Sequence, residues 1–151
     1  MKIYIASDHA GFALKQELVL FLSARGFEVF DCGPEEYVHD DDYPDYISRV
    51  AEKISEHPHV QVRGIVIGSS GQGEAMVANR FRNVRAAVFY GGPKHVLTLS
   101  REHNDANILS LGAHFLTSDD AKKAVLLWLG TEFSGGERHI RRIEKIENYS
   151  K

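Results

Sequence analysis

The strand-to-helix junction at residues 64–74 decides the fold, and its sequence is GIVIGSSGQGE. Its apolar start, residues 64–67, is typical of a strand that is buried on both faces. A glycine- and serine-rich segment follows at once, and a helical pattern begins at Glu74. A buried strand, a glycine loop and a helix in this order are typical of a parallel α/β sheet.

The same alternation extends outward in both directions. Short apolar runs predict further strands at 3–6, 27–30, 85–89 and 107–111. The spacing of apolar residues predicts helices at 12–25, 44–56, 74–80, 93–102, 118–129 and from about 137, with Pro44 well placed to open the second. No repeat, linker or break in composition interrupts the 151 residues. We therefore expect one α/β domain whose parallel sheet is covered by helices on both faces.

Composition excludes several classes of protein. The 18 basic and 21 acidic residues give a net charge of -3, without the basic excess of most nucleic-acid-binding proteins. A single cysteine, Cys32, excludes a disulfide framework and a multi-cysteine zinc site. The 8 histidines contain no HxxxH pair, and the segment His57-Pro58-His59 is expected to be a solvated loop, so no metal site is predicted. No apolar run or signal peptide points to a membrane, so we expect a cytosolic protein.

Polar residues follow the first and third predicted strands. In parallel sheets, ligands bind in the crevice outside the carboxyl ends of the strands. Asp8 and His9 follow the first strand, and the glycine loop follows the third. Both Asp8 and His9 can face the crevice, or His9 can simply lie near the start of the next helix. The loops around His103 and Gly112 are further candidates, although His103 also fits a solvated loop.

The glycine loop does not match three familiar motifs. A P-loop has lysine after its last glycine, whereas Gly73 is followed by Glu74. A dinucleotide-binding loop would need a small residue in place of Met76, and a nucleophile elbow centred on Ser70 would need glycine in place of Gln72. The loop suits a transient oxyanion better, with Glu74 as a nearby base. The alternative is that Glu74 is only a first-turn acid favoured by the helix dipole.

The C-terminal segment 135–143, GGERHIRRI, combines an apolar stripe with two arginines. On a helix, Arg138 and Arg142 lie four residues apart on one face, where two guanidinium groups can bind a phosphate. The alternative is an exposed face on which the arginines pair with Glu137 and Glu144. If this helix extends off the domain, its arginines would serve the site of a partner subunit.

Five motifs in order resemble the RpiB/LacA/LacB family of sugar-phosphate isomerases. They are SDHAGF at 7–12, DYP at 42–44, GIVIGSSGQGEAMVANR at 64–80, REHNDANILSLG at 101–112 and FSGGERHIRR at 133–142. The resemblance implies a Rossmann-like α/β/α sandwich and a homodimer, or a tetramer of paired dimers, whose sites use residues of both chains. It also implies an aldose–ketose isomerisation of a sugar phosphate without metal or cofactor. The expected substrate is ribose 5-phosphate, and the alternatives are an allose or galactose 6-phosphate, another sugar, or a non-catalytic sugar-phosphate-binding protein.

The resemblance also assigns roles to individual residues. One branch of the family has a cysteine base at the end of the third strand, where this chain has Gly68, and the other has a glutamate after the glycine loop, as Glu74 here. The implied roles are Glu74 as base, His103 as ring-opening acid, Asp8, His9, Tyr43 and Asn104 as substrate contacts, Ser69, Ser70, Gly71, Gln72 and Gly73 as the anion-hole loop, and Arg138 and Arg142 as a phosphate clamp.

Two positions depart from the family pattern. His114 stands where the family usually has an arginine, two residues after the last glycine of LSLG. Glu137 is an extra residue between Gly136 and Arg138. Loss of an always-charged guanidinium and gain of a carboxylate are both expected to weaken phosphate binding or change its geometry.

Overall fold

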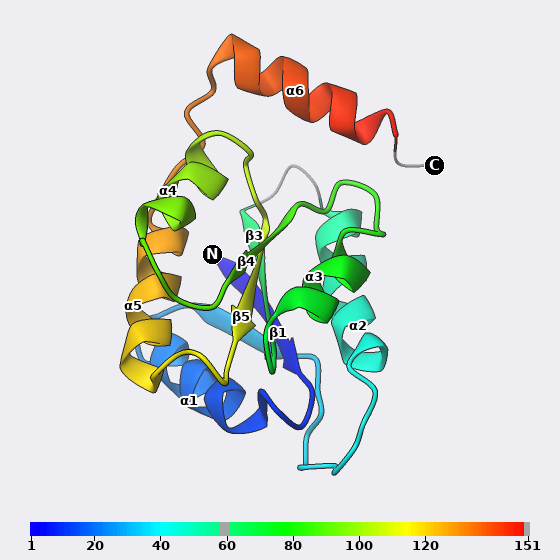
Figure 1. The fold of residues 1–151 in the computed structure, drawn as a ribbon, viewed down its shortest axis with the longest axis vertical. Helices are drawn as coiled ribbons and strands as arrows, with labels where there is room; N and C mark the ends of the chain where they lie inside the picture. The colour runs from blue at the N-terminus through cyan, green and yellow to red at the C-terminus, as the bar shows by residue number, and fades with distance from the viewer. Residues whose placement is uncertain (58–60, 150–151) are drawn as a thin grey trace.

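The structure is a computed structural model that describes residues 1–57 and 61–149. Five parallel strands form one sheet in the order β2-β1-β3-β5-β4. The strands are β1 (Lys2–Ser7), β2 (Glu28–Asp31), β3 (Val62–Gly68), β4 (Ala86–Phe89) and β5 (Ile108–Gly112). The helices are α1 (Phe12–Ser23), α2 (Pro44–Glu56), α3 (Gln72–Ala78), α4 (His95–Glu102), α5 (Ser118–Leu129) and α6 (Glu137–Glu147). The predicted α/β/α sandwich with a five-stranded parallel sheet is confirmed (Figure 1).

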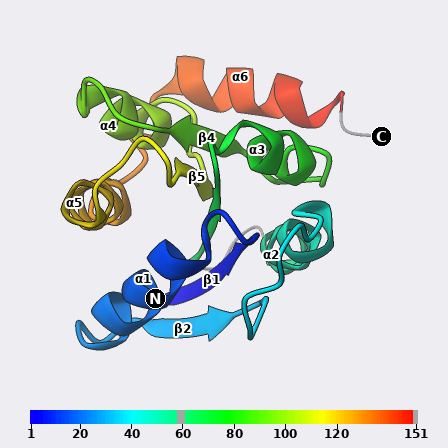
Figure 2. The same cartoon turned by 60° about the horizontal axis from the view of Figure 1, so that its bottom comes forward.

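Helices cover both faces of the sheet, as the apolar strands require. Because side chains alternate along a strand, Ile65 and Ile67 face one core and Val66 the other. The first core lies beneath α1, α4 and α5 and contains the fully buried Trp128. The second lies beneath α2 and α3 (Figure 2). In the part of the chain that the structure describes, no helix is both long and apolar enough to span a membrane.

Element boundaries differ from the sequence prediction by only a few residues. Helix α3 starts at Gln72 rather than Glu74, because Gly71 adopts a left-handed φ of 77° and forms the N-terminal cap. Strand β3 starts at Val62, where it already pairs with β1. Helix α2 begins at Pro44 as predicted. In the predicted loop His57-Pro58-His59, residues 58 and 59 lie outside the described residues.

The strand order places a crevice between β1 and β3. The chain leaves β1 toward β2 on one side, whereas β3 has β5 on its other side. Ligands of open α/β sheets bind where the strand order changes direction in this way. The register aligns Ser7 with Ile67 and Gly68 with Gly112, so the loops after β1, β3 and β5 meet at the carboxyl ends of the strands.

A buried lysine anchors the long loop between β2 and α2. The ammonium group of Lys15 donates to both carboxylate oxygens of Asp31, at 2.8 and 2.7 Å, and to the carbonyl of Pro34 at 2.6 Å. All three ammonium protons thus have acceptors, which compensates the removal of this charge from water. The anchor fixes the start of the loop that returns toward β1 at Asp41.

Helix α6 lies at the amino ends of the strands, near the starts of β4 and β5 (Figure 1). The Arg85 guanidinium, just before β4, bonds the carboxylate of Glu147 at 2.8 Å. The Ser134 N–H, in the segment leading to α6, donates to the carbonyl of Glu102 at the end of α4. These contacts hold α6 away from the carboxyl ends of the strands.

Candidate active site

The loops at the carboxyl ends of the strands enclose a cavity of about 480 Å³. We call it the carboxyl-end pocket. Its walls come from the loops after β1, β3 and β5, the loop before α2 and the first turn of α3. The lining residues are Asp8, His9, Ala10, Tyr43, Ser69, Ser70, Gly73, Glu74 and His114.

Glu74 is a buried acid in the wall of the carboxyl-end pocket. Its residue is 3% exposed, and within the described residues its Oε2 atom is buried without a hydrogen-bond partner. Burial raises the pKa of the Glu74 carboxyl, and the nearby charge of Asp8 raises it further, although a backbone N–H lowers it. A first-turn acid favoured only by the helix dipole would be solvated, so the burial supports the alternative of a proton-accepting group.

Gly68 makes the room that this carboxylate occupies. A Cβ atom built on Gly68 would overlap the carboxylate of Glu74. Glycine at the end of β3 and glutamate in the first turn of α3 are therefore sterically coupled. Cys32 lies elsewhere, half-buried, and lines a separate cavity beside β2.

Hydrogen bonds and close packing hold the glycine loop between β3 and α3. The Ser110 hydroxyl, from β5, donates to the carbonyl of Gly71 at 2.6 Å. The N–H of Gln72 donates to the hydroxyl of Ser70 at 3.3 Å. A side chain on Gly73 would come within 2.7 Å of the Tyr43 ring, so glycine is required for this close approach. Ser69, Ser70 and Gly73 face the pocket, Gly71 is buried behind it, and Gln72 is exposed and does not line it.

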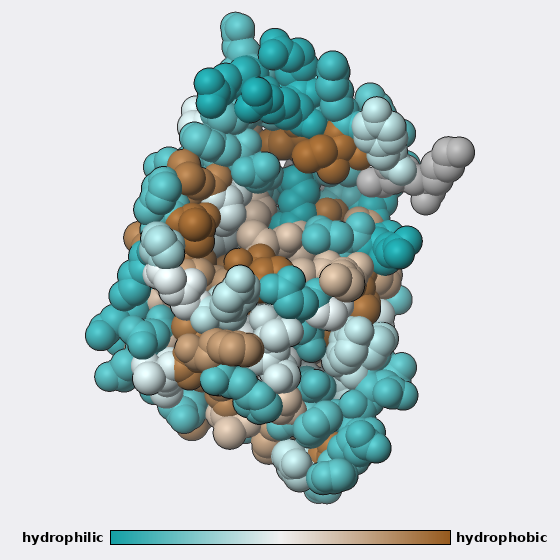
Figure 3. All heavy atoms as spheres, in the orientation of Figure 1, coloured by the Kyte–Doolittle hydropathy of each residue, from teal (hydrophilic) through white to brown (hydrophobic). Residues whose placement is uncertain are grey.

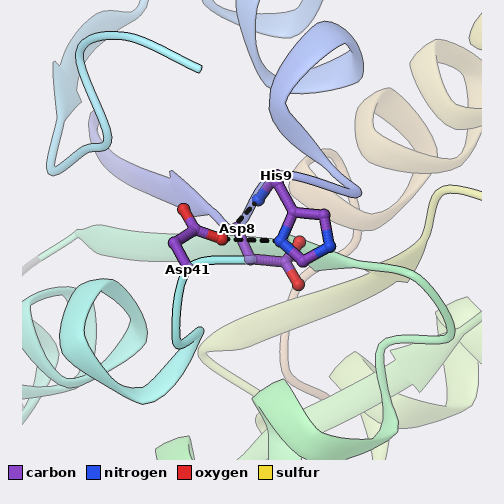
Figure 4. A group of neighbouring side chains, drawn as sticks. All are labelled: Asp8, His9 and Asp41. Carbon is purple, nitrogen blue, oxygen red and sulfur yellow. Dashed lines mark hydrogen bonds and ion pairs between the residues drawn. The ribbon is translucent and has the colours of Figure 1, made fainter. Parts of the chain in front are cut away.

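Asp8 and His9 both line the pocket, so His9 faces the crevice rather than only lying near the start of α1. The buried Asp8 carboxylate accepts from the N–H of Gly11 at 3.1 Å. The oxygen Oδ1 of Asp41 accepts from the His9 N–H at 2.9 Å and lies 2.7 Å from His9 Nδ1 (Figure 4). The hydrogen bond to Asp41 is the main cause that raises the pKa of His9. Asp41 was missed from the sequence, because it stands in an acidic run that resembles a solvated loop.

These same three side chains also have the composition of a metal site. Asp8, His9 and Asp41 offer possible ligand atoms that lie within 4.8 Å of one another. The Nδ1 of His9 and the Oδ1 of Asp41 already bond each other, however, and the hydrogen bond accounts for their closeness. We therefore describe the group as a hydrogen-bonded pair beside a buried acid.

His114 takes its predicted place in the pocket. Its Nδ1 lies 2.9 Å from the Ser69 hydroxyl, and its N–H donates to the Ser69 carbonyl at 3.1 Å. The imidazole is exposed at the rim. It therefore connects the loop after β5 to the glycine loop.

The remaining predicted site residues lie at the amino ends of the strands, in and beside α6. The His103 ring, at the end of α4, stacks on His139 of α6 with centroids 4.3 Å apart. Burial lowers the pKa of His139, and the charges of His103, Arg138 and Arg142 lower it further. We call these four residues the α6 cluster.

The expectation that the loop around His103 lines the crevice within one chain is wrong. His103 precedes β5 rather than following a strand, so it lies at the amino end of the sheet. Asn104 is exposed beside it and adjoins a third cavity, of about 350 Å³, that Arg85 and Ile146 also line. One chain therefore carries two separate groups of predicted site residues.

The fold and the carboxyl-end pocket define a doubly wound α/β protein with a buried acid facing a glycine loop at the strand ends. The sequence model of the ribose/galactose isomerase family matches residues 3–146 of this chain. The chain belongs to the ribose/galactose isomerase family.

Several individual proteins resemble the chain over almost its full length. Ribose-5-phosphate isomerase B of Mycolicibacterium paratuberculosis is 36% identical over 100% of this chain and 92% of the relative. A crystal structure of ribose-5-phosphate isomerase B from Mycoplasma genitalium with bound ribulose-5-phosphate has a TM-score of 0.92 and 38% identity, covering 98% of this chain and 95% of that one. The Clostridium thermocellum ribose-5-phosphate isomerase B structure has a TM-score of 0.89 and 44% identity, covering 98% and 96%.

Proposed function

We propose that this protein interconverts ribose 5-phosphate and ribulose 5-phosphate, with Glu74 as the base. The observation that carries the proposal is the buried carboxylate of Glu74 in the wall of the carboxyl-end pocket, whose Oε2 has no hydrogen-bond partner within the described residues. The names of the relatives and the ribulose-5-phosphate bound to the Mycoplasma genitalium protein support the choice of substrate.

The proposed reaction passes through an enediolate. Glu74 removes the proton from C2 of the open-chain aldose, the C–H electron pair forms a C1=C2 double bond, and the carbonyl electrons move to O1. The loop N–H groups and Ser70 stabilise the negative charge on O1. Glu74 then returns its proton to C1, and the proton of the C2 hydroxyl passes to O1, which leaves a ketone at C2. General acid–base catalysis and oxyanion stabilisation each contribute a factor of roughly 10² to 10³.

The test of this function is NMR of the sugar in D₂O. We expect ribose 5-phosphate to convert to ribulose 5-phosphate with deuterium entering at C1, because the base exchanges its proton with solvent. Allose 6-phosphate, galactose 6-phosphate and free ribose are run alongside. Turnover of only another sugar in this panel would replace the proposed substrate, and a protein that binds the sugars but exchanges no deuterium would be a binding protein.

We further propose that the ring-opening acid His103, the sugar contact Asn104 and the clamp residues Arg138 and Arg142 come from a second copy of the chain. Both arginines are exposed on α6, and their guanidinium groups supply the positive charge that phosphate binding requires. Ile140 and Ile146 of α6 are 41% and 46% exposed. Apolar side chains gather on the side of α6 that faces a hollow in the surface (Figure 3), which is a surface suited to a protein partner.

Mixing two inactive variants tests this shared site. In a twofold-symmetric dimer of Glu74→Gln with His103→Asn, one site carries both substitutions and the other carries neither. When the two variants are co-expressed in equal amounts, about half of the dimers are expected to be heterodimers, each with one intact site of two. The mixture is therefore expected to have about one quarter of wild-type activity. Glu74→Gln mixed with Asp8→Ala is the control, since both residues line the same pocket and no intact site can form. Equal activity of the two mixtures would show that His103 does not act across the interface.

A further inference from the structure

The His9–Asp41 pair joins two segments that are 32 residues apart in the sequence. Asp41 Oδ1 accepts from the His9 backbone N–H at 2.9 Å and lies 2.7 Å from its Nδ1, so one oxygen atom holds both the chain and the ring. Figure 4 shows the second ring nitrogen, Nε2, pointing away from Asp41. A histidine held in this way has Nδ1 protonated and only Nε2 free to meet a ligand.

The two side chains of the pair differ in their exposure to solvent. The side chain of Asp41 is 4% exposed and that of His9 is 34% exposed. Within the described residues, the other oxygen of Asp41, Oδ2, is buried without a hydrogen-bond partner. A buried carboxylate with one bonded oxygen stabilises a positive charge on its partner more than a solvated carboxylate would.

Four other titratable side chains surround the pair: Asp8, Asp40, His39 and Tyr46. The carboxylates of Asp8 and Asp40 also raise the pKa of His9, whereas its own burial lowers it. His39 stacks beside the ring with centroids 6.3 Å apart. Tyr46 is close enough to Asp41 for that carboxylate to raise the pKa of its phenol, after burial. The hydrogen bond that Asp41 accepts is the largest single cause of the raised pKa of His9.

We propose that Asp41 is a positioning residue that holds His9 as an imidazolium whose Nε2–H group faces an oxyanion in the carboxyl-end pocket. The identity of that oxyanion as the substrate phosphate rests on the proposed function. A phosphate monoester has a second pKa near 6. A charged His9 above that pH would let the pocket bind the dianion, to which charge-assisted hydrogen bonds are strong.

The test compares Asp41→Asn with Asp40→Asn. Asparagine keeps the size and an acceptor oxygen but removes the charge at Asp41. Asp40 is exposed in the same loop and has a φ of 63°, a conformation that asparagine tolerates well, so its variant removes an equal charge without strain. In ¹⁵N-NMR titration of the free protein, we expect the pKa of His9 to fall by about one unit or more in Asp41→Asn and by much less in Asp40→Asn.

A second readout uses binding. Asp41→Asn is expected to weaken binding of inorganic phosphate, and to raise KM for ribose 5-phosphate, about tenfold at pH 7.5 with kcat little changed. Asp41→Glu is expected to restore part of both effects, and Asp41→Ser replaces Asp41→Asn if the latter does not fold. An unchanged His9 pKa in Asp41→Asn, or an equal fall in Asp40→Asn, would overturn the proposal. If the pKa and phosphate effects occur in a protein that does not isomerise the sugar, the positioning role stands and the proposed function falls.

Discussion

Replacing Glu74 by glutamine is expected to lower kcat by roughly 10² to 10⁴-fold while leaving the fold and KM close to wild type. Glutamine has nearly the same shape but cannot accept the proton from C2. Because Glu74 is buried and its Oε2 has no hydrogen-bond partner within the described residues, the neutral amide removes a buried charge that costs stability. Steady-state kinetics and thermal unfolding measure the two effects separately.

As the proposed base, Glu74 is also expected to set the pH dependence of the reaction. A base acts only when deprotonated, so activity falls as the pH drops through its pKa. Burial raises the pKa of Glu74, so this acid limb is expected above the range near 4.3 of an ordinary glutamate. Asp119→Asn is the matched control, since Asp119 is an exposed acid in the first turn of α5. Near-normal turnover in Glu74→Gln would show that another group removes the proton.

Replacing Gly68 by alanine is expected to lower kcat/KM by about 10²-fold or more, although Glu74 itself is not substituted. The added methyl group would overlap the Glu74 carboxylate, which must then rotate out of its place. A displacement of about 1 Å in a catalytic group costs a factor near 10². A crystal structure of the variant is expected to show the carboxylate moved while β3 keeps its position.

A double variant separates displacement of the base from damage to the fold. In the Glu74→Gln background, Gly68→Ala is expected to cause little further loss of activity, because the two substitutions act through one group. Gly130→Ala is the control for a new methyl group, since its nearest neighbour there would be the Leu126 carbonyl at 3.2 Å. Losses that multiply in the double variant would mean that Gly68 acts independently of Glu74.

The layers of the fold could be predicted from the sequence because the spacing of apolar residues distinguished strands from helices in each segment. The order of the strands was not predictable, since hydrophobic patterns do not say which strands are neighbours. The glycine loop, Asp8 and Glu74 could be placed in one crevice because all of them follow strands of a parallel sheet. His103 could not be placed in this way, because it precedes its strand.

The burial of Glu74 and the contact of Asp41 with His9 could be found only in the three-dimensional structure. A first-turn glutamate is usually solvated, and only the missing side chain at Gly68 allows this one to be buried. Asp41 belongs to the run Asp40-Asp41-Asp42, in which nothing local distinguishes the middle residue. Its contact with His9 depends on the path of the loop that Lys15 anchors.

The overlap at Gly68 also limits which pairs of residues can stand at positions 68 and 74. Any side chain at position 68, even a single methyl group, would displace the Glu74 carboxylate from the place that it now occupies. The two positions are 6 residues apart in the sequence but share one volume in the fold. They are therefore expected to vary together, with a buried glutamate at 74 found only where position 68 is glycine.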